Sequence, residues 1–396
     1  MADSNTEHIA KKARENTPVH VWLRDEVKPH EQRTALTPEN AAKLVEAGFT
    51  VSVERTTNDR CFPDEEYEKV GCTLVETGSW PKAPKDAIIL GLKELPESTE
   101  PISHDHIFFA HCFKGQEGWR ELMQRFLSGG GTIYDLEFLK RDGMRVAAFG
   151  RPAGIIGCAA GVLLWTHQQR QRVRVAGGES AEPMAPLRVY ASEDALVAHV
   201  REELEAVRQL PGQTCQTPVA LVMGALGRVG GGAVHFLQRL GGLVEIVAWD
   251  KEETAKGGPF KEIAEADIFI NSIYLEAKIA PFIDTATVLN TPTRRLTAVS
   301  DVSCDYTSPN NPIAIYQKGT SFEEPEDRVI EHTADQLPLA VIAIDHLPTL
   351  LPRESSVNYG EQMLEHFLNL ANLDTDPVWQ GAKKDFLRIA AQVSSD

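Results

Sequence analysis

The chain has 396 residues, of which 42% are hydrophobic and 24% are charged, and its formal net charge at pH 7 is −17. This length predicts about two domains, and the composition is that of an ordinary globular protein. The negative charge argues against nucleic acids and anionic membranes as partners, although local arginines can still bind an anionic substrate.

No apolar run reaches the length of a membrane span. The polar amino-terminal segment, residues 1–18, lacks the apolar core of a secretory signal, and we expect it to be a disordered tail. Six scattered cysteines form no CxxC pair. We therefore expect no metal site, no disulfide framework and a location in the reducing cytoplasm. No exposed apolar stripe stands out on the expected helices, so we expect a monomer.

Apolar runs and helical patterns alternate through the first part of the chain. The expected helices are 37–45, 64–70 and 118–127, and the first of them begins with a Thr-Pro capping signal. Such alternation predicts a parallel sheet with helices on both faces. The expected strands are 20–24, 49–53, 72–75, 87–92, 106–113, 132–136 and 146–149.

The middle of the chain changes character. Residues 154–168 are apolar and rich in small side chains, which predicts a long buried helix that links the two halves. Residues 170–186 contain a basic run, two glycines and two prolines, which predicts an exposed loop. We expect a substrate domain at 19–153 together with about 350–396, a linker region at 154–217, and a nucleotide-binding domain at 218–349. The fold class is α/β, with two Rossmann-like domains and the active site in the cleft between them.

The stretch 218–250 has the order that a dinucleotide site needs. An apolar strand is followed by glycines at 224, 227, 230, 231 and 232, then by a helical pattern, a second strand and Asp250. Glycines allow the backbone to approach a pyrophosphate, and a helix N-terminus favours its negative charge. An acid at the end of the second strand binds both ribose hydroxyls and favours NAD over NADP. The glycine spacing is G-x-x-G-x-x-G rather than the standard G-x-G-x-x-G, so a tight turn without a ligand is the alternative.

Two strand ends carry candidate acid–base groups. Lys93 follows the strand 87–92, and His111 lies near the end of the strand 106–113. If these strands are parallel neighbours, both side chains emerge at the same edge of the sheet. A partly desolvated lysine has a lowered pKa, and histidine titrates near neutrality. A solvated surface lysine and a core histidine remain open as alternatives.

Arginines and an Asp-His pair also lie at strand ends. Arg33 and Arg145 are placed to bind carboxylates through two parallel hydrogen bonds, although ordinary surface arginines are the commoner case. Asp345 and His346 follow the last expected strand, and a helix cap is the alternative for them.

The sequence resembles the NAD-dependent, L-lysine-forming saccharopine dehydrogenases that end fungal lysine biosynthesis. More distant similarity, in the R-x-A-L-T-P type of opening, extends to alanine dehydrogenase and the transhydrogenase domain. The segments that carry the resemblance are LRDEVKPHEQRTALTP (23–38), IILGLKELPE (88–97), FFAHCFKGQEGW (108–119), YDLEFL (134–139), RVAAFG (145–150), MGALGRVGGGA (223–233), GGPF (257–260), ADIFINSIYL (266–275) and IDHLP (344–348).

The resemblance implies oxidation of saccharopine by NAD, followed by hydrolysis of an imine to lysine and 2-oxoglutarate. It also implies a role for individual residues. Lys93 and His111 match the acid–base pair, and Glu94 and Glu137 match the glutamates that tune the pKa of the lysine. Substrate contacts carry over to Arg33, Lys93, Gln116, Arg145, Phe149, Val302 and Asp305. Cofactor contacts carry over to Gly227, Arg228, Asp250, Thr254, Tyr274, Ile344, Asp345, His346 and Leu347.

Two other functions stay open on the residues alone. A dehydrogenase of alanine or another simple amino acid has no need of two arginines for a long diacid. A catalytically silent NAD-binding regulator needs only the stretch from Gly224 to Asp250 and is indifferent to Lys93 and His111.

Overall fold

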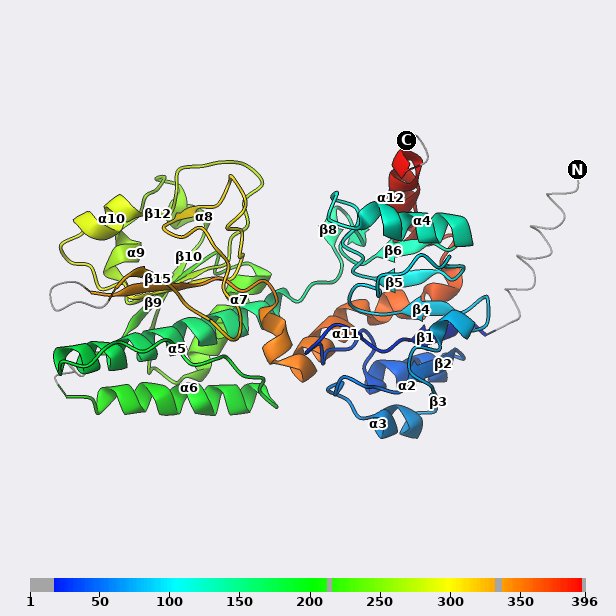
Figure 1. Cartoon of the computed structure of the whole chain (residues 1–396), viewed down its shortest axis with the longest axis horizontal. Helices are drawn as coiled ribbons and strands as arrows, with labels where there is room; N and C mark the ends of the chain where they lie inside the picture. Colours follow the sequence, from blue (N-terminus) through cyan, green and yellow to red (C-terminus); the bar gives the residue numbers. More distant parts are fainter. Residues whose placement is uncertain (1–17, 212–215, 332–336, 394–396) are drawn as a thin grey trace, which may run out of the picture. The chain divides into compact units, whose positions relative to one another are not determined.

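The computed structural model describes residues 18–211, 216–331 and 337–393, which form two compact units (Figure 1). The first unit comprises Met1–Ala148 and Ser355–Asp396, and the second comprises Phe149–Glu354. Residues 1–17 of the expected tail lie outside the described part of the chain. Within the described residues, no helix is long and apolar enough to cross a membrane.

The first unit is built on a six-stranded parallel sheet with the order β3-β2-β1-β4-β5-β6. Its strands are β1 (His20–Leu23), β2 (Thr50–Glu54), β3 (Thr73–Val75), β4 (Ile88–Leu90), β5 (His106–Phe108) and β6 (Ile133–Asp135). The strand order reverses between β1 and β4, and ligands of such sheets bind beyond the carboxyl ends of the strands at this point. The flanking helices are α2 (Pro38–Glu46), α3 (Asp64–Lys69), α4 (Trp119–Gly129), α11 (Pro352–Leu368) from Ser355 onward, and α12 (Pro377–Val393), with the 3-10 turns η1 (Trp80–Lys82) and η3 (Leu370–Asn372).

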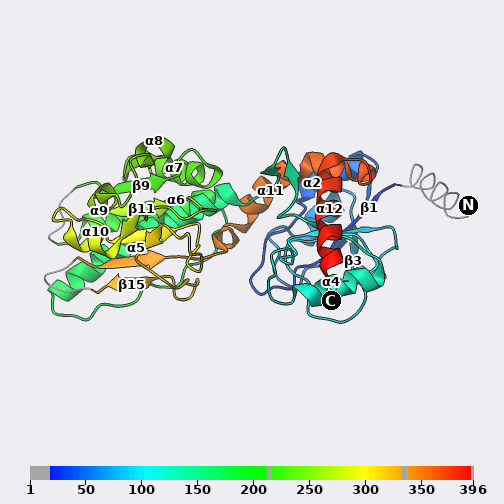
Figure 2. The same ribbon diagram turned by 90° about the horizontal axis from the view of Figure 1, so that it is seen from above.

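Most of the helices and strands predicted for this unit are confirmed. Thr37 caps α2 by accepting a hydrogen bond from the Asn40 amide at 3.2 Å. The carboxy-terminal helices belong to this unit, and Figure 2 shows α12 beside α4. The expected strand at 146–149 is wrong, because the chain instead forms a small antiparallel pair, β7 (Lys140–Arg141) with β8 (Met144–Arg145). Positive φ angles at Asp142 and Gly143 close this hairpin on itself.

The second unit contains a six-stranded sheet with the order β10-β9-β11-β13-β16-β15, in which only β15 is antiparallel. Its strands are β9 (Val219–Met223), β10 (Glu245–Trp249), β11 (Ile268–Asn271), β13 (Ala298–Asp301), β15 (Asp327–Ile330) and β16 (Leu339–Ile342). A separate pair is formed by β12 (Ile283–Asp284) and β14 (Ile313–Ala314). The helices are α5 (Gly150–Ala176), α6 (Glu193–Arg208), α7 (Arg228–Arg239), α8 (Lys251–Thr254), α9 (Lys261–Glu265) and α10 (Thr285–Asn290), with the 3-10 turn η2 (Leu347–Leu350).

The apolar runs of the second sheet are explained by burial on both faces. In β9, Ala220 and Val222 join the core cluster beneath α5, α6 and α7, whereas Leu221 and Met223 join the cluster on the opposite face. Successive side chains of a strand point to opposite faces, so a strand buried on both sides must be apolar throughout. The same alternation holds along β11 and β16.

The long helix α5 belongs to the second unit and is not a linker between two units. It packs beside α6 and α7 (Figure 1). Glycines at 154, 157 and 161 face its neighbours, and a Cβ at Gly154 would lie 2.8 Å from the Val229 carbonyl carbon. Small residues therefore let the backbones of α5 and α7 touch. The helix continues to Ala176, so the expected loop at 170–186 begins later than the basic run suggested.

Candidate active site

Three predicted site residues follow three neighbouring strands of the first unit. Lys93 comes after β4, His111 after β5 and Glu137 after β6. Because these strands are parallel, the three residues lie at the same carboxyl edge of the sheet. The condition on which the pairing of Lys93 with His111 depended, parallel neighbouring strands, is confirmed.

Glu94 lies between His111 and Lys28. Its Oε1 lies 3.7 Å from His111 Nε2, and its Oε2 lies 3.7 Å from Lys28 Nζ. The His111 side chain is 39% exposed, and its backbone adopts a positive φ of 49°. His111 is therefore not a core histidine, and it occupies an uncommon backbone conformation of the kind that is often found at functional sites.

The pKa values of this group are shifted by burial and by neighbouring charges. Burial lowers the pKa of Lys93, as do the charges of Arg33 and Lys28, whereas Glu31 and Glu94 raise it. Burial also lowers the pKa of His111, and Lys93 lowers it further, against Glu94 and Glu137. Both groups are thereby more easily deprotonated than in water, which favours proton transfer near neutral pH.

Arg33 lies inside the protein rather than on its surface, with 3% of its side chain exposed. Its Nε and NH2 donate to the two carboxylate oxygens of Glu31 at 2.8 Å and 2.6 Å. This fork is the bidentate geometry predicted for a substrate carboxylate, but Glu31 occupies it in this structure. The charges of both residues still act on Lys93.

Glu137 forms ion pairs with two basic side chains at the same edge of the sheet. Its Oε1 accepts hydrogen bonds from Lys114 Nζ at 2.7 Å and from Arg145 NH2 at 3.1 Å. Burial raises the pKa of Glu137, but Lys114, Arg145 and His111 outweigh burial, so that its pKa is lowered overall. Gln116 lies in the same loop, where its side chain accepts a hydrogen bond from the Lys114 amide.

In the second unit, the glycine turn joins β9 to α7. Gly224 has a φ of +83°, and Gly227 precedes the first residue of α7, Arg228, which is exposed. A Cβ on Gly227 would meet only the Gly224 carbonyl oxygen, at 3.3 Å. This contact is only slightly tighter than an ordinary one, so the protein itself constrains position 227 weakly. The missing side chain also leaves room for a phosphate at the N-terminus of a 12-residue helix.

Asp250 follows β10 and is fixed beside this turn. Its Oδ2 accepts a hydrogen bond from the Leu226 amide at 3.0 Å, and its backbone amide donates to Glu253. Thr254 donates its hydroxyl to the Asp250 carbonyl oxygen at 2.9 Å. The carboxylate is thus held at the carboxyl edge next to the glycine turn, where a ribose binds in Rossmann folds.

The other predicted contacts differ in exposure. Tyr274 is 66% exposed, and Asp345 and His346 are exposed after β16. Ile344 and Leu347, in contrast, are each 1% exposed, backbone included, and belong to the apolar core.

The three predicted substrate residues of this unit, Phe149, Val302 and Asp305, lie in different environments. Phe149 directly precedes α5, and the partly buried Val302 packs against the same core cluster, next to Gly157. Asp305 has a pKa raised by burial and by Asp301, and one of its buried carboxylate oxygens has no hydrogen-bond partner.

Comparisons with known proteins identify the family. Residues 22–156 match the family model for the alanine dehydrogenase/PNT N-terminal domain. A saccharopine dehydrogenase [NAD(+), L-lysine-forming] of Schizosaccharomyces pombe is 48% identical over 368 residues, covering 92% of this chain and 96% of the relative. The enzyme of the same name from Candida albicans is 46% identical, covering 96% of this chain and 99% of the relative. The chain belongs to the family of NAD-dependent, L-lysine-forming saccharopine dehydrogenases.

Two solved structures share the fold of this chain. An L-alanine dehydrogenase superposes with a TM-score of 0.60 at 19% identity and covers 92% of this chain and 94% of its own. A transhydrogenase from Sinorhizobium meliloti gives a TM-score of 0.53 at 15% identity, with 91% and 97% covered. At these identities the likeness concerns the fold, and it confirms the α/β class with parallel sheets flanked by helices.

Sequence reasoning missed several residues of this family member's site. Glu31 and Lys114 are charged partners whose signal was weak, since each is one polar residue in a polar loop. A buried network beneath the second unit's edge was also missed. There Asp301 accepts hydrogen bonds from Asn271 at 2.9 Å and from Tyr316 at 2.5 Å. Its signal was an acid that ends an otherwise apolar strand.

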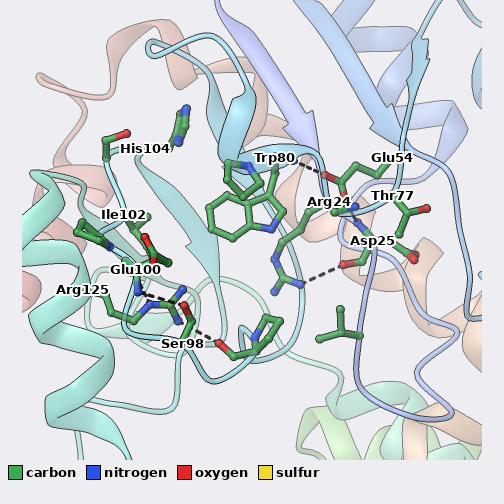
Figure 3. A pocket seen from close by; sticks show the side chains of 16 residues that line it. Arg24, Asp25, Glu54, Thr77, Trp80, Ser98, Glu100, Ile102, His104 and Arg125 are labelled. Carbon is green, nitrogen blue, oxygen red and sulfur yellow. Dashed lines mark hydrogen bonds between the residues drawn. The ribbon is translucent and has the colours of Figure 1, made fainter.

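A pocket of about 450 Å³ lies next to this site within the first unit (Figure 3). Trp80, Ile102 and several prolines form apolar walls, and Arg24 and Arg125 contribute charge. Neither Lys93 nor His111 is among the residues that line it. The pocket is therefore a neighbour of the acid–base group and not its substrate site.

Proposed function

We propose that this protein catalyses the reversible, NAD-dependent conversion of L-saccharopine to L-lysine and 2-oxoglutarate, as the last step of the 2-aminoadipate route to lysine. The observation that carries the proposal is the cluster at the first unit's edge. Two groups with lowered pKa values, Lys93 and His111, share Glu94 as a charged neighbour there. This reaction requires several proton transfers, and such a pair supplies them.

The second unit fits NAD. Gly227 leaves open space at the N-terminus of α7, and the Asp250 carboxylate lies beside the same turn. Bound there, NAD would supply the acceptor for the hydride of the glutarate carbon of saccharopine. The carboxylate of Asp250 would accept the ribose hydroxyls and repel a 2′-phosphate, which is the proposed basis for choosing NAD over NADP. Gly227, Arg228, Thr254, Tyr274, Asp345 and His346 complete the proposed cofactor contacts. Ile344 and Leu347 are proposed on the resemblance alone, because both residues are buried.

The proton transfers fall to Lys93 and His111. The secondary amine of saccharopine must lose a proton as its carbon loses a hydride, which gives an imine. A base then removes a proton from the water that adds to the imine, and an acid protonates the lysine nitrogen when the C–N bond breaks. Glu94 and Glu137 tune the pair, because each lies within electrostatic reach of His111.

Carboxylate recognition is proposed for the cations near this group. Arg145 is 42% exposed and donates from NH2 to Glu137 at the rim of the cluster, so it is placed to meet a substrate carboxylate. Arg33 contributes its positive charge. Its guanidinium can bind a substrate carboxylate directly only if its two hydrogen bonds to Glu31 break. Gln116, Phe149, Val302 and Asp305 are the remaining proposed substrate contacts, and the reaction requires that the substrate meet the nicotinamide.

One assay tests the function against its alternatives. Purified protein is mixed with lysine, 2-oxoglutarate and NADH, and the absorbance of NADH is followed. Oxidation with this set supports the proposal. Oxidation only with pyruvate and ammonia would show a dehydrogenase of simple amino acids, and inertness with both sets while NADH still binds would show a silent NAD-binding protein.

We also infer that the protein acts in the cytosol as a monomer on free amino-acid substrates. The net charge of −17 disfavours nucleic acid and anionic membranes. Three described cysteines, Cys72, Cys112 and Cys158, are free and buried, which suits a reducing compartment. Size-exclusion chromatography with light scattering tests the monomer, and a mass near 87 kDa, twice the chain mass of 43.7 kDa, would contradict it.

A further inference from the structure

The backbone of Lys93 is held from two sides by residues that follow β1. The Leu92 and Lys93 amides donate to the two carboxylate oxygens of Glu26, at 2.6 Å and 2.9 Å. The Lys93 carbonyl oxygen accepts a hydrogen bond from Arg24 NH2. Three hydrogen bonds thus fix the peptide groups on both sides of the Lys93 side chain.

Both of these side chains are buried and linked to each other. Arg24 is 2% exposed and Glu26 is 6% exposed. Arg24 NH1 donates to the Asp25 carbonyl oxygen at 3.2 Å and lies 3.5 Å from Glu26 Oε2. The guanidinium lies against Gly91, where a Cβ would be 2.5 Å from Arg24 Cζ. Only glycine at 91 admits the arginine, so the segment 91–93 is shaped around Arg24 and Glu26, which we call the clamp.

We propose that Arg24 and Glu26 are positioning residues, which hold the Lys93 backbone so that its ammonium group stays in line for proton transfer. The proposal rests on the acid–base role proposed for Lys93. Neither clamp residue is required to touch the substrate. A buried arginine and a buried carboxylate are costly to keep unless they are hydrogen-bonded, and here their partners are the peptide groups that carry Lys93.

The clamp acts by geometry rather than by charge on Lys93. The charges that shift the pKa of Lys93 belong to Arg33, Glu31, Lys28 and Glu94, and neither clamp residue is among these causes. Replacing Glu26 by glutamine keeps the shape but leaves one acceptor oxygen, so one of the two amide N–H groups loses its partner. The segment then relaxes, and a displacement of about 1 Å at a reacting group costs about 100-fold in rate.

Glu26→Gln is therefore expected to lower kcat for lysine, 2-oxoglutarate and NADH by roughly 10- to 100-fold, with NADH binding unchanged. The matched control is Glu326→Gln in the second unit. Glu326 is equally buried, with a 6% exposed side chain, and also accepts a main-chain amide, that of Met184, and an arginine. Its substitution should leave kcat within about twofold, because its loss costs only local stability.

Two readouts separate positioning from a loss of folded enzyme. When proton transfer becomes slower, the solvent deuterium isotope effect on kcat rises, whereas a smaller folded fraction leaves this ratio unchanged. In addition, Glu26→Gln should cost nothing further in a Lys93→Met background, because the clamp acts only through Lys93. The apparent pKa values in the pH profile of kcat should be the same in Glu26→Gln as in the parent protein.

Arg24→Ala supplies an independent test, because Arg24 lines the pocket of Figure 3. Free guanidinium can enter this pocket and replace the missing group, at concentrations well below those that unfold proteins. We expect partial recovery of kcat with guanidinium and none with sodium at equal ionic strength. If Arg24→Ala does not fold, Glu26→Gln alone decides.

The outcomes distinguish this inference from the function on which it rests. Unchanged turnover in Lys93→Met would overturn the acid–base role itself. A large loss in Lys93→Met with normal turnover or an unchanged isotope effect in Glu26→Gln would overturn the clamp and leave the function intact. Equal losses in Glu26→Gln and Glu326→Gln would also overturn it.

Discussion

Replacing Gly230 by alanine should disrupt the glycine turn, while the same change at the next residue should be harmless. A Cβ on Gly230 would lie 2.6 Å from the Gly224 carbonyl carbon and 2.8 Å from Ala225 Cα. Ordinary van der Waals contact begins at 3.4 Å, so the turn and the helix must separate by at least 0.8 Å, the difference between 3.4 and 2.6 Å. The obstacle is backbone and not a flexible side chain, so we expect a loss of about 3 kcal/mol, at the upper end for overpacked sites.

Gly231→Ala is the matched control on the same helix. Its Cβ would meet only the Ala225 carbonyl oxygen, at 3.9 Å, which is an ordinary contact. Because alanine is favoured over glycine inside a helix, this variant should gain about 0.5–1 kcal/mol. The free energy of unfolding is measured by urea titration of circular dichroism, and NADH binding is measured by fluorescence.

Gly230→Ala should also weaken NADH binding, because the displaced turn carries the α7 N-terminus with it. Gly231→Ala should bind NADH like the parent protein. The reasoning is that close approach of the backbone, and not a general need for glycine, decides where glycine is required. It would be refuted if the two variants had the same free energy of unfolding, whether both lost or both gained stability.

Four further outcomes are expected. Gly227→Ala should keep the parent stability within about 1 kcal/mol but weaken NADH at least about tenfold, because the clash is with a phosphate; equal NADH affinity in a titration would contradict this. Lys93→Met combined with His111→Gln should lower turnover by about two to four decades while NADH binding survives, as seen by combining stopped-flow turnover with fluorescence titration. Asp250→Ser should weaken NADH and relax discrimination against NADPH, measured as the ratio of kcat/KM for the two cofactors. Burial lowers the pKa of His106 to about 3, below its unfolded value of about 6.5. Between these values the unfolded chain binds a proton that the folded chain does not, so His106 costs up to about 1.4 kcal/mol of stability per pH unit as the pH falls below about 6.5. His106→Phe should show a shallower loss than the parent protein in urea titrations from pH 7 to pH 4.

The strands and the edge on which the site lies could be predicted because two strong signals coincide. A strand buried on both faces must be apolar along its whole length, and β9 and β11 are. Parallel strands place the residues after their carboxyl ends at one edge, which is enough to group Lys93 and His111, whereas Glu137 was expected from the resemblance alone. Neither inference needs a contact between distant residues.

The pairings within the edge could not be predicted, because they depend on side-chain direction. Arg33 was expected to meet a substrate, yet its fork is filled by Glu31, only two residues away. Ile344 and Leu347 match a family motif, but their side chains face the core and not a ligand. The expected strand at 146–149 does not form, and the chain makes the hairpin of β7 and β8 just before it.

The altered glycine spacing illustrates how function can survive a change in pattern. In the standard motif the first glycine makes the tight turn, the second admits the pyrophosphate and the third allows the helix to pack closely. Gly224 has the positive φ of a turn, a Cβ on Gly227 would make one slightly tight contact at 3.3 Å, and Gly230 is pressed against the backbone of the turn. The three roles are thus filled in the same order by G-x-x-G-x-x-G. The additional residue between the first two glycines lengthens the turn, and the Asp250 carboxylate binds an amide within it, that of Leu226. The acid proposed to select the cofactor therefore also fixes the loop proposed to receive the phosphates. For this reason we expect Asp250→Ser to weaken NADH binding as well as to relax the discrimination against NADPH.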